Sequence, residues 1–110
     1  MPTANILNLS DQTISFGTLT VDNGRITRIK HLGPERPDQP YILPGFVDAH
    51  VHIESSLLTP PQFARLAVVH GTVATISDPH EIGNVLGVPG VEYMIEEGKR
   101  VLFKFMFGAP

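Results

Sequence analysis

Two histidines that stand one residue apart, His50 and His52, constrain this chain more than any other feature. They close the segment PGFVDAHVH at residues 44–52, in which apolar residues follow a Pro-Gly pair. This composition predicts a short strand, and because side chains alternate across a strand, Asp48, His50 and His52 are expected on one face. Two neutral imidazoles on one rigid strand end can bind a single divalent cation such as Zn, Mn, Fe, Co or Ni. The alternative is a histidine pair without a ligand.

We expect the ring nitrogens of His50 and His52 to converge at the end of one buried strand. Each acidic residue beside them allows two interpretations. Asp48 could accept a hydrogen bond from a histidine ring N–H and so orient that ring, or it could bond to nearby backbone. Glu54 follows the strand on the same alternation, where it could face substrate or metal, or bond as a loop carboxylate to nearby N–H groups.

A second polar group follows the segment TVATIS at residues 72–77, which predicts a buried strand. This group is the segment DPHE at residues 78–81. Asp78, His80 and Glu81 are all competent metal ligands, so they could contact substrate or an auxiliary metal. Otherwise they would cap a turn and stabilise a loop.

The first part of the chain reads as strands only. Short strands are expected at residues 5–9, 13–21 and 25–29, and Asn23-Gly24 predicts a two-residue type I′ turn between the last two. The proline-rich segment at residues 33–40 then reads as a linker.

After the linker, strands alternate with helices. One helix is expected from Thr59 to His70, with Thr59 as N-cap, proline at the first helical position and Gln62 completing a capping box. It should stop at Gly71, and His70 in its last turn favours the helix dipole, which predicts a structural role for that histidine. Its buried side is expected to contain Phe63, Leu66, Ala67 and His70 or its neighbours.

A second helix is expected from Pro89 to Glu97, and a third strand from Arg100 to Phe107. Together with the earlier strands this gives the order βαβαβ, which favours parallel pairing with right-handed crossovers. The inward side of the second helix is expected to contain Val91, Met94 and Ile95.

Several segments resemble one enzyme family. Residues 45–52 resemble the first barrel strand of the amidohydrolase superfamily, and IESSLLTP at residues 53–60 resembles the bacterial and archaeal adenine deaminases. The block GTVATISDPHEIGNVLG at residues 71–87 resembles the next strand and loop of that family, and NGRI at residues 23–26 resembles the turn before the barrel in many amidohydrolases. His-X-His alone is typical only of the superfamily, whereas HIESS followed by DPHEI narrows the resemblance to adenine deaminases and close relatives.

The resemblance implies an α/β fold, the start of a metal-dependent (β/α)8 amidohydrolase barrel preceded by part of a small β-sandwich. Residues 1–42 would hold the sandwich part and the linker, and residues 43–110 the first βαβαβ portion of the barrel. Because a complete barrel needs about 250 residues, we expect this chain of 110 residues to be an N-terminal fragment.

The resemblance also implies the conversion of adenine and water to hypoxanthine and ammonia by metal-activated hydroxide. His50 and His52 would bind the metal, with Mn or Fe favoured over Zn, and a purine would be the small-molecule substrate. The main proton-shuttle carboxylate is expected beyond Pro110, so the fragment should be inactive alone, and the full-length parent is expected to be a homo-oligomer. Two other functions stay open, an amidohydrolase acting on a cyclic amide (dihydroorotase-like or imidazolonepropionase-like) and a noncatalytic fragment.

Composition removes other classes of function. The formal net charge of −3 provides no basic field for nucleic acid or an anionic membrane, so neither partner is expected. The chain has no cysteine, so any metal would be held by nitrogen and oxygen. Because the N-terminus lacks the pattern of a signal peptide and no apolar run reaches ~18 residues, a cytoplasmic location is expected.

Overall fold

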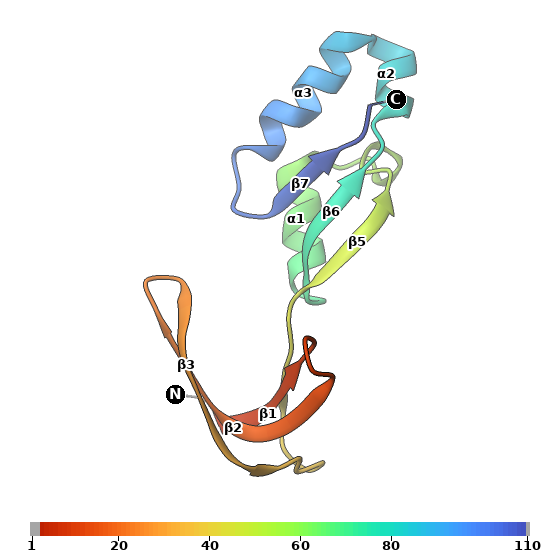
Figure 1. Ribbon diagram of the computed structural model, residues 1–110. Coiled ribbons are helices and arrows are strands. Elements are labelled where there is room, and N and C mark those ends of the chain that lie inside the picture. Colours follow the sequence, from red (N-terminus) through yellow and green to blue (C-terminus); the bar gives the residue numbers. More distant parts are fainter. Residues whose placement is uncertain (1–2, 110) are drawn as a thin grey trace. The chain divides into compact units, whose positions relative to one another are not determined.

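The computed structural model describes residues 3–109, which form two compact units that divide between Pro44 and Gly45 (Figure 1). No helix in this described range is long and apolar enough to cross a membrane. In chain order the elements are β1 (Thr3–Asn8), β2 (Thr13–Asp22), β3 (Arg25–Pro34), β4 (Tyr41–Ile42), β5 (Phe46–Val51), the 3-10 helix η1 (Glu54–Ser56), α1 (Pro60–Val68), β6 (Thr72–Ser77), α2 (His80–Leu86), α3 (Val88–Gly98) and β7 (Lys104–Phe107).

The first unit is one four-stranded sheet in the order β3-β2-β1-β4. Strands β1, β2 and β3 pair antiparallel, as two hairpins require, and β4 pairs parallel to β1. Asn23 and Gly24 have φ angles of 49° and 73°, the left-handed conformation that a type I′ turn demands, so the hairpin prediction is confirmed. Strand β3 continues to Pro34, five residues past its expected end, and β4 was not expected.

The segment between β3 and β4 is fixed to the sheet by the side chain of Asn5. Asn5 is fully buried, and its Nδ2 donates to the carbonyl oxygens of Arg36 and Gln39 at 2.7 and 3.1 Å. Its Oδ1 accepts a hydrogen bond from the Arg36 backbone N–H at 2.8 Å. Three bonds from one buried amide satisfy backbone groups that a strand would otherwise pair. The predicted linker is therefore an ordered loop that packs on β1.

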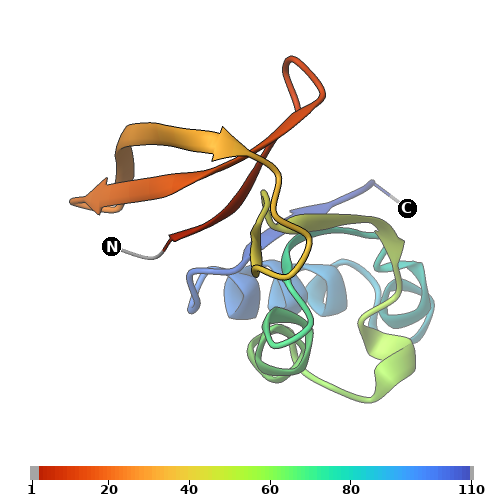
Figure 2. The same ribbon diagram turned by 90° about the horizontal axis from the view of Figure 1, so that it is seen from below.

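The second unit is a three-stranded parallel sheet in the order β5-β6-β7. Helix α1 contacts β6 and α3 contacts β7, and Figure 2 shows both helices on the same face of the sheet. The predicted parallel pairing of strands connected by helices is therefore confirmed, and the fold of this unit is α/β. Two helices, α2 and α3, rather than one connect β6 to β7. On the helix-covered face Thr75 and Ser77 are fully buried, whereas Ile76 and Met106 on the other face stay 41% and 45% exposed.

Helix α1 differs from its prediction in length and in orientation. It ends at Val68 rather than His70, and Thr59 stands at the N-cap without a side-chain capping bond, so the capping box is wrong. Pro60 and Ala64, one turn apart, are the buried residues. Leu66 is 60% exposed, and His70, which follows the end of the helix, is exposed as well, so neither belongs to the buried side.

Helix α3 confirms the second expected helix, with Met94 buried and with Val91 and Ile95 half-buried. Strand β7 begins at Lys104 rather than Arg100, and the residues before it form a bend. Helix α2 occupies residues for which a loop was expected, and it starts after Pro79 without a side-chain cap.

Strand β5 was expected to be buried and is exposed along most of its length. It lies at one edge of the sheet, so it has a neighbour on one side only. The His-X-His segment is thus presented from an edge strand.

Candidate metal centre

The side chains of His50 and His52 converge at the carboxyl end of β5. Their Nε2 atoms lie 3.1 Å apart, and the two rings meet edge to face with centroids 4.8 Å apart. Alternation along the strand sends both side chains to one side, as expected. The predicted convergence of the ring nitrogens is therefore confirmed.

The orientation of the His52 ring is set by the backbone of Asp78. His52 Nδ1 lies 2.9 Å from the Asp78 carbonyl oxygen, at the end of the neighbouring strand β6. Because a carbonyl oxygen only accepts, Nδ1 carries the proton and donates it. In the neutral ring Nε2 then carries a lone pair, which is the state that binds a metal.

The side chain of Asp78 orients a third histidine, His80, in the same way. His80 Nδ1 and Asp78 Oδ2 are 3.0 Å apart, and the His80 ring meets the His52 ring with centroids 4.8 Å apart. The hydrogen bond from His80 lowers the pKa of Asp78, and the charges of His80 and His52 act in the same direction, whereas partial burial opposes them. One residue thus holds two rings, the first through its carbonyl and the second through its carboxylate.

Glu81 adds a carboxylate to this cluster. One potential ligand atom from each of His52, His80 and Glu81 lies within 4.8 Å of the other two. Glu81 Oε2 also accepts a hydrogen bond from Ser55 Oγ at 2.6 Å. The nearby Glu54 accepts the Ile82 backbone N–H at 3.5 Å through Oε1, and its Oε2 is buried without a partner among residues 3–109.

These residues fit a divalent cation. Metal–nitrogen bonds of about 2.0–2.1 Å place two nitrogens on one ion roughly 3 Å apart, which agrees with the observed separation of His50 Nε2 and His52 Nε2. The donors are imidazole nitrogens and a carboxylate oxygen, the set that suits Zn, Mn or Fe. Two of the rings are already held through Nδ1, as in established metal sites.

Comparison with known proteins agrees with this geometry. The model of the Amidohydrolase family matches residues 41–110, which contain every residue of the cluster. The chain belongs to the amidohydrolase family. Amidohydrolases are metal-dependent enzymes, so the family and the donor set point to the same kind of site.

Curated relatives of this amidohydrolase chain include proteins named adenine deaminase. The one from a Sulfurovum species is 54% identical over 106 residues, and that from Salinibacter ruber is 55% identical over 107 residues. A third, from Borreliella burgdorferi, is 50% identical over 107 residues. The three alignments cover 96–97% of this chain and 19–20% of the relatives. The chain therefore spans about a fifth of the length of the curated relatives that it matches.

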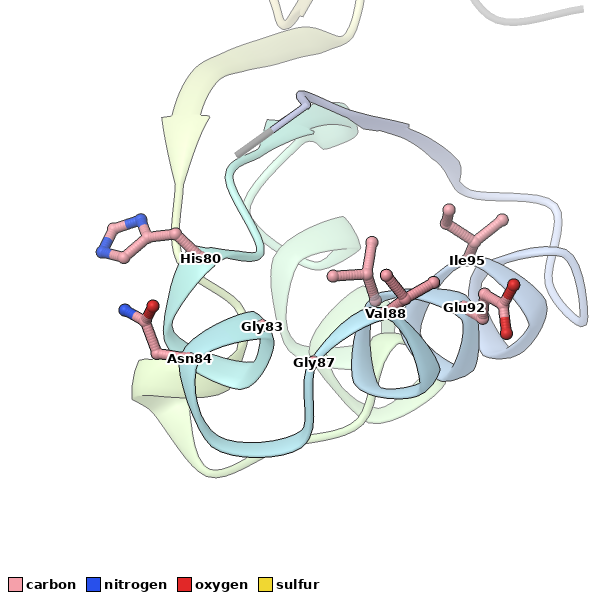
Figure 3. Close-up of a pocket in the computed structure, with 8 residues that line it drawn as sticks. His80, Gly83, Asn84, Gly87, Val88, Glu92 and Ile95 are labelled. Atoms are coloured by element: carbon pink, nitrogen blue, oxygen red, sulfur yellow. The ribbon is translucent and has the colours of Figure 1, made fainter.

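An open cavity of about 660 Å³ lies between α2 and α3, and His80 of the cluster is one of its lining residues. Figure 3 shows His80 and Asn84 projecting from the same side of α2, one turn apart. Helix α3 contributes Val88, Glu92 and Ile95 to the lining. Asn84 and Glu92 were not predicted as site residues, since the residues between 82 and 95 read as a loop and an ordinary amphipathic helix.

The remaining predicted residues fall as follows. Asp48 Oδ1 accepts the His50 backbone N–H at 3.1 Å, which is the backbone alternative for this residue. Asp78, which sequence reasoning treated as a ligand or a turn cap, is the residue that orients rings. The contact between Ser55 and Glu81 was missed, although both follow neighbouring parallel strands whose carboxyl ends share one edge of the sheet.

Proposed function

We propose that the protein containing this chain converts adenine and water to hypoxanthine and ammonia. The observation that carries the proposal is the convergence of His50 Nε2 and His52 Nε2 in a chain that is about half identical to proteins named adenine deaminase. In this reaction the oxygen of water bonds to C6 and the bond from C6 to the exocyclic nitrogen breaks. One proton of the water goes to ring N1, and the other leaves with the amine as ammonia.

In this proposal His50 and His52 hold a divalent metal, with Mn or Fe favoured over Zn. When bound, such a cation lowers the pKa of water to near 7 and so makes hydroxide available at neutral pH. His80 and Glu81 contact the substrate or an auxiliary metal, Asp78 keeps His52 and His80 in their binding tautomers, and Glu54 braces the start of α2. The main proton-shuttle carboxylate comes from another part of the whole protein.

The proposal extends to the organisation of the whole protein. Residues 43–110 form the first βαβαβ portion of a (β/α)8 barrel, and residues 1–42 form part of a small β-sandwich. The parallel sheet, with its polar cluster after the carboxyl ends of β5 and β6, supports this assignment, because barrel active sites lie at that end of the strands. The whole protein acts on a small purine, works in the cytoplasm and assembles as a homo-oligomer.

The proposal is tested on the purified complete protein. We expect metal-dependent release of ammonia from adenine that is lost on chelation and restored by Mn. His52→Asn removes the histidine that belongs both to the pair with His50 and to the cluster with His80 and Glu81. The amount of bound metal and the activity should therefore both fall at least tenfold. His70→Asn is the matched control, because His70 is an exposed histidine after α1 and should leave both unchanged. A protein that binds metal, does not deaminate adenine and hydrolyses a cyclic amide would be another kind of amidohydrolase. A protein that binds no metal would favour a noncatalytic role.

A further inference from the structure

The 3-10 helix η1 contacts the first turn of α2, beside the cluster of His52, His80 and Glu81. Ser55 Oγ donates to Glu81 Oε2 at 2.6 Å, and Glu54 Oε1 accepts the backbone N–H of Ile82. The paired residues are 26 and 28 positions apart in the chain. Two adjacent residues of η1 are thus tied to two adjacent residues of α2.

Ser55 is presented by a turn that is itself fixed. Ile53 is fully buried, and its carbonyl oxygen accepts both the backbone N–H of Ser56 at 3.0 Å and the Ser56 hydroxyl at 2.5 Å. The Leu57 backbone N–H then closes the turn on the Glu54 carbonyl oxygen at 2.9 Å. Because the turn is anchored in this way, the Ser55 hydroxyl has a defined position.

Glu81 needs such a partner, since its side chain is exposed and rotates about three bonds. The hydroxyl of Ser55 occupies Oε2, while Oε1 has no hydrogen-bond partner among residues 3–109. Oε2 is thereby fixed, and Oε1 is left available to bind a cation. The carboxylate lies within 4.8 Å of potential ligand atoms of His52 and His80.

We propose that Ser55 is a positioning residue that holds the Glu81 carboxylate in the cluster with His52 and His80. The proposal rests on the proposed function, in that the cluster binds a divalent cation. Groups that orient a ligand commonly change metal affinity or activity by 10- to 100-fold when they are removed. If the Glu81 carboxylate is held in place, the reaction also avoids the loss of rate that follows when a catalytic or binding group is displaced by a small distance.

The experiment uses the complete protein, freed of metal and titrated with Mn²⁺, with ammonia release from adenine as a second readout. Ser55→Ala should weaken Mn²⁺ binding or lower kcat/KM by about 10- to 100-fold. Ser55→Thr keeps the hydroxyl and should restore most of the loss. Ser15→Ala is the matched control, because it also removes a hydrogen-bonded serine hydroxyl, one that lies 2.7 Å from His31 Nδ1 within the first unit, and it should leave both readouts unchanged.

A double-mutant cycle with Glu81→Ala separates positioning from a merely structural contact. If Ser55 acts through Glu81, Ser55→Ala should cause no further loss of Mn²⁺ affinity or kcat/KM in the Glu81→Ala background. If the contact only stabilises the packing of η1 on α2, Ser55→Ala would lower the unfolding temperature and leave Mn²⁺ affinity and kcat/KM unchanged. That result would overturn the proposal. Wild-type protein that binds Mn²⁺ but does not deaminate adenine would overturn the proposed function, and the affinity cycle would still decide the role of Ser55.

Discussion

Asp78 contacts the rings of two histidines, His52 and His80, by different means. Its carbonyl oxygen accepts a hydrogen bond from His52 Nδ1, and its carboxylate oxygen Oδ2 accepts one from His80 Nδ1. The first contact survives any substitution that keeps the backbone in place, whereas the second depends on the aspartate side chain. The position therefore connects the end of β6 to both rings.

Tyr41 provides a residue-scale test in the other unit. Its hydroxyl donates to Glu35 Oε1 at 2.6 Å, and this hydrogen bond is the main reason that the pKa of Tyr41 is raised above 10.0, with partial burial and the charge of Glu35 adding to it. A raised pKa means that the bond stabilises the fold below the pKa of the unfolded chain and is lost as the pH rises through the folded value. We expect the midpoint of the Tyr41 phenolate titration, followed by absorbance as the difference from Tyr41→Phe protein, to lie above pH 10.0.

Replacing Glu35 by alanine should move this titration down toward the ordinary value for tyrosine. Asp38→Asn is the control, because Asp38 belongs to the same loop and bonds to Gln39 rather than to Tyr41. An unchanged titration in Glu35→Ala protein would show that the hydrogen bond does not raise the pKa of Tyr41.

At the scale of elements, the parts that could be predicted are those that local patterns determine. Alternation along β5 was enough to bring His50 and His52 together, and Asn23-Gly24 was enough to place a hairpin turn. The contact of Ser55 with Glu81 joins residues 26 positions apart. It depends on how two strands and their loops pair, and no local pattern in the sequence encodes that pairing.

Helix α2 was missed for a related reason. It has seven residues, it follows a proline, it contains Gly83 and it ends at Leu86, just before Gly87, so neither periodicity nor a capping side chain marks it. Its stability comes from contacts with η1 and α3. The exposed Leu66 shows the same limit, because the amphipathic pattern of α1 does not tell which of two adjacent sides will meet the sheet.

The packing of α2 on α3 leads to a prediction about two glycines. A Cβ at Gly90 would lie 2.9 Å from the Ile82 carbonyl oxygen and 2.9 Å from the Leu86 Cβ, closer than packed atoms allow. Although alanine favours helices, Gly90→Ala should lower the free energy of unfolding by about 1–3 kcal/mol, because α2 and α3 must move apart. It should also reduce Mn²⁺ binding, since α2 carries His80 and Glu81. Urea unfolding and Mn²⁺ titration of the complete protein measure the two effects.

Gly83 is the matched control for this prediction. A Cβ there would meet its nearest neighbour, Val91 Cγ2, at 3.5 Å, which is an ordinary contact. Gly83→Ala should therefore raise the free energy of unfolding by up to about 1 kcal/mol through helix propensity alone. Equal effects of the two substitutions would mean that the close approach of α3 to α2 does not determine stability.

At the scale of the whole molecule, both units leave apolar surface uncovered. In the second unit β5 and β7 are both edge strands, with Phe46 and Val47 56% and 55% exposed on β5. In the first unit, apolar side chains of the single sheet line an open cavity of about 200 Å³, among them Leu19, Ile26 and Ile29. Such edges and faces favour pairing with further strands. This agrees with a chain that spans about a fifth of the length of its curated relatives.

The last prediction concerns residues 1–110 expressed alone. Because unpaired parallel edges and uncovered apolar faces promote association, we expect the isolated chain to elute as aggregates or oligomers in gel filtration. We also expect no ammonia from adenine with excess Mn²⁺, because the proton-shuttle carboxylate of the proposed reaction is supplied elsewhere in the whole protein. The complete protein, assayed in parallel, should release ammonia and so control for the metal and the substrate. Metal-dependent ammonia release from a monomer of the isolated chain would contradict both expectations. It would mean that His50 together with the cluster of His52, His80 and Glu81 suffices for catalysis.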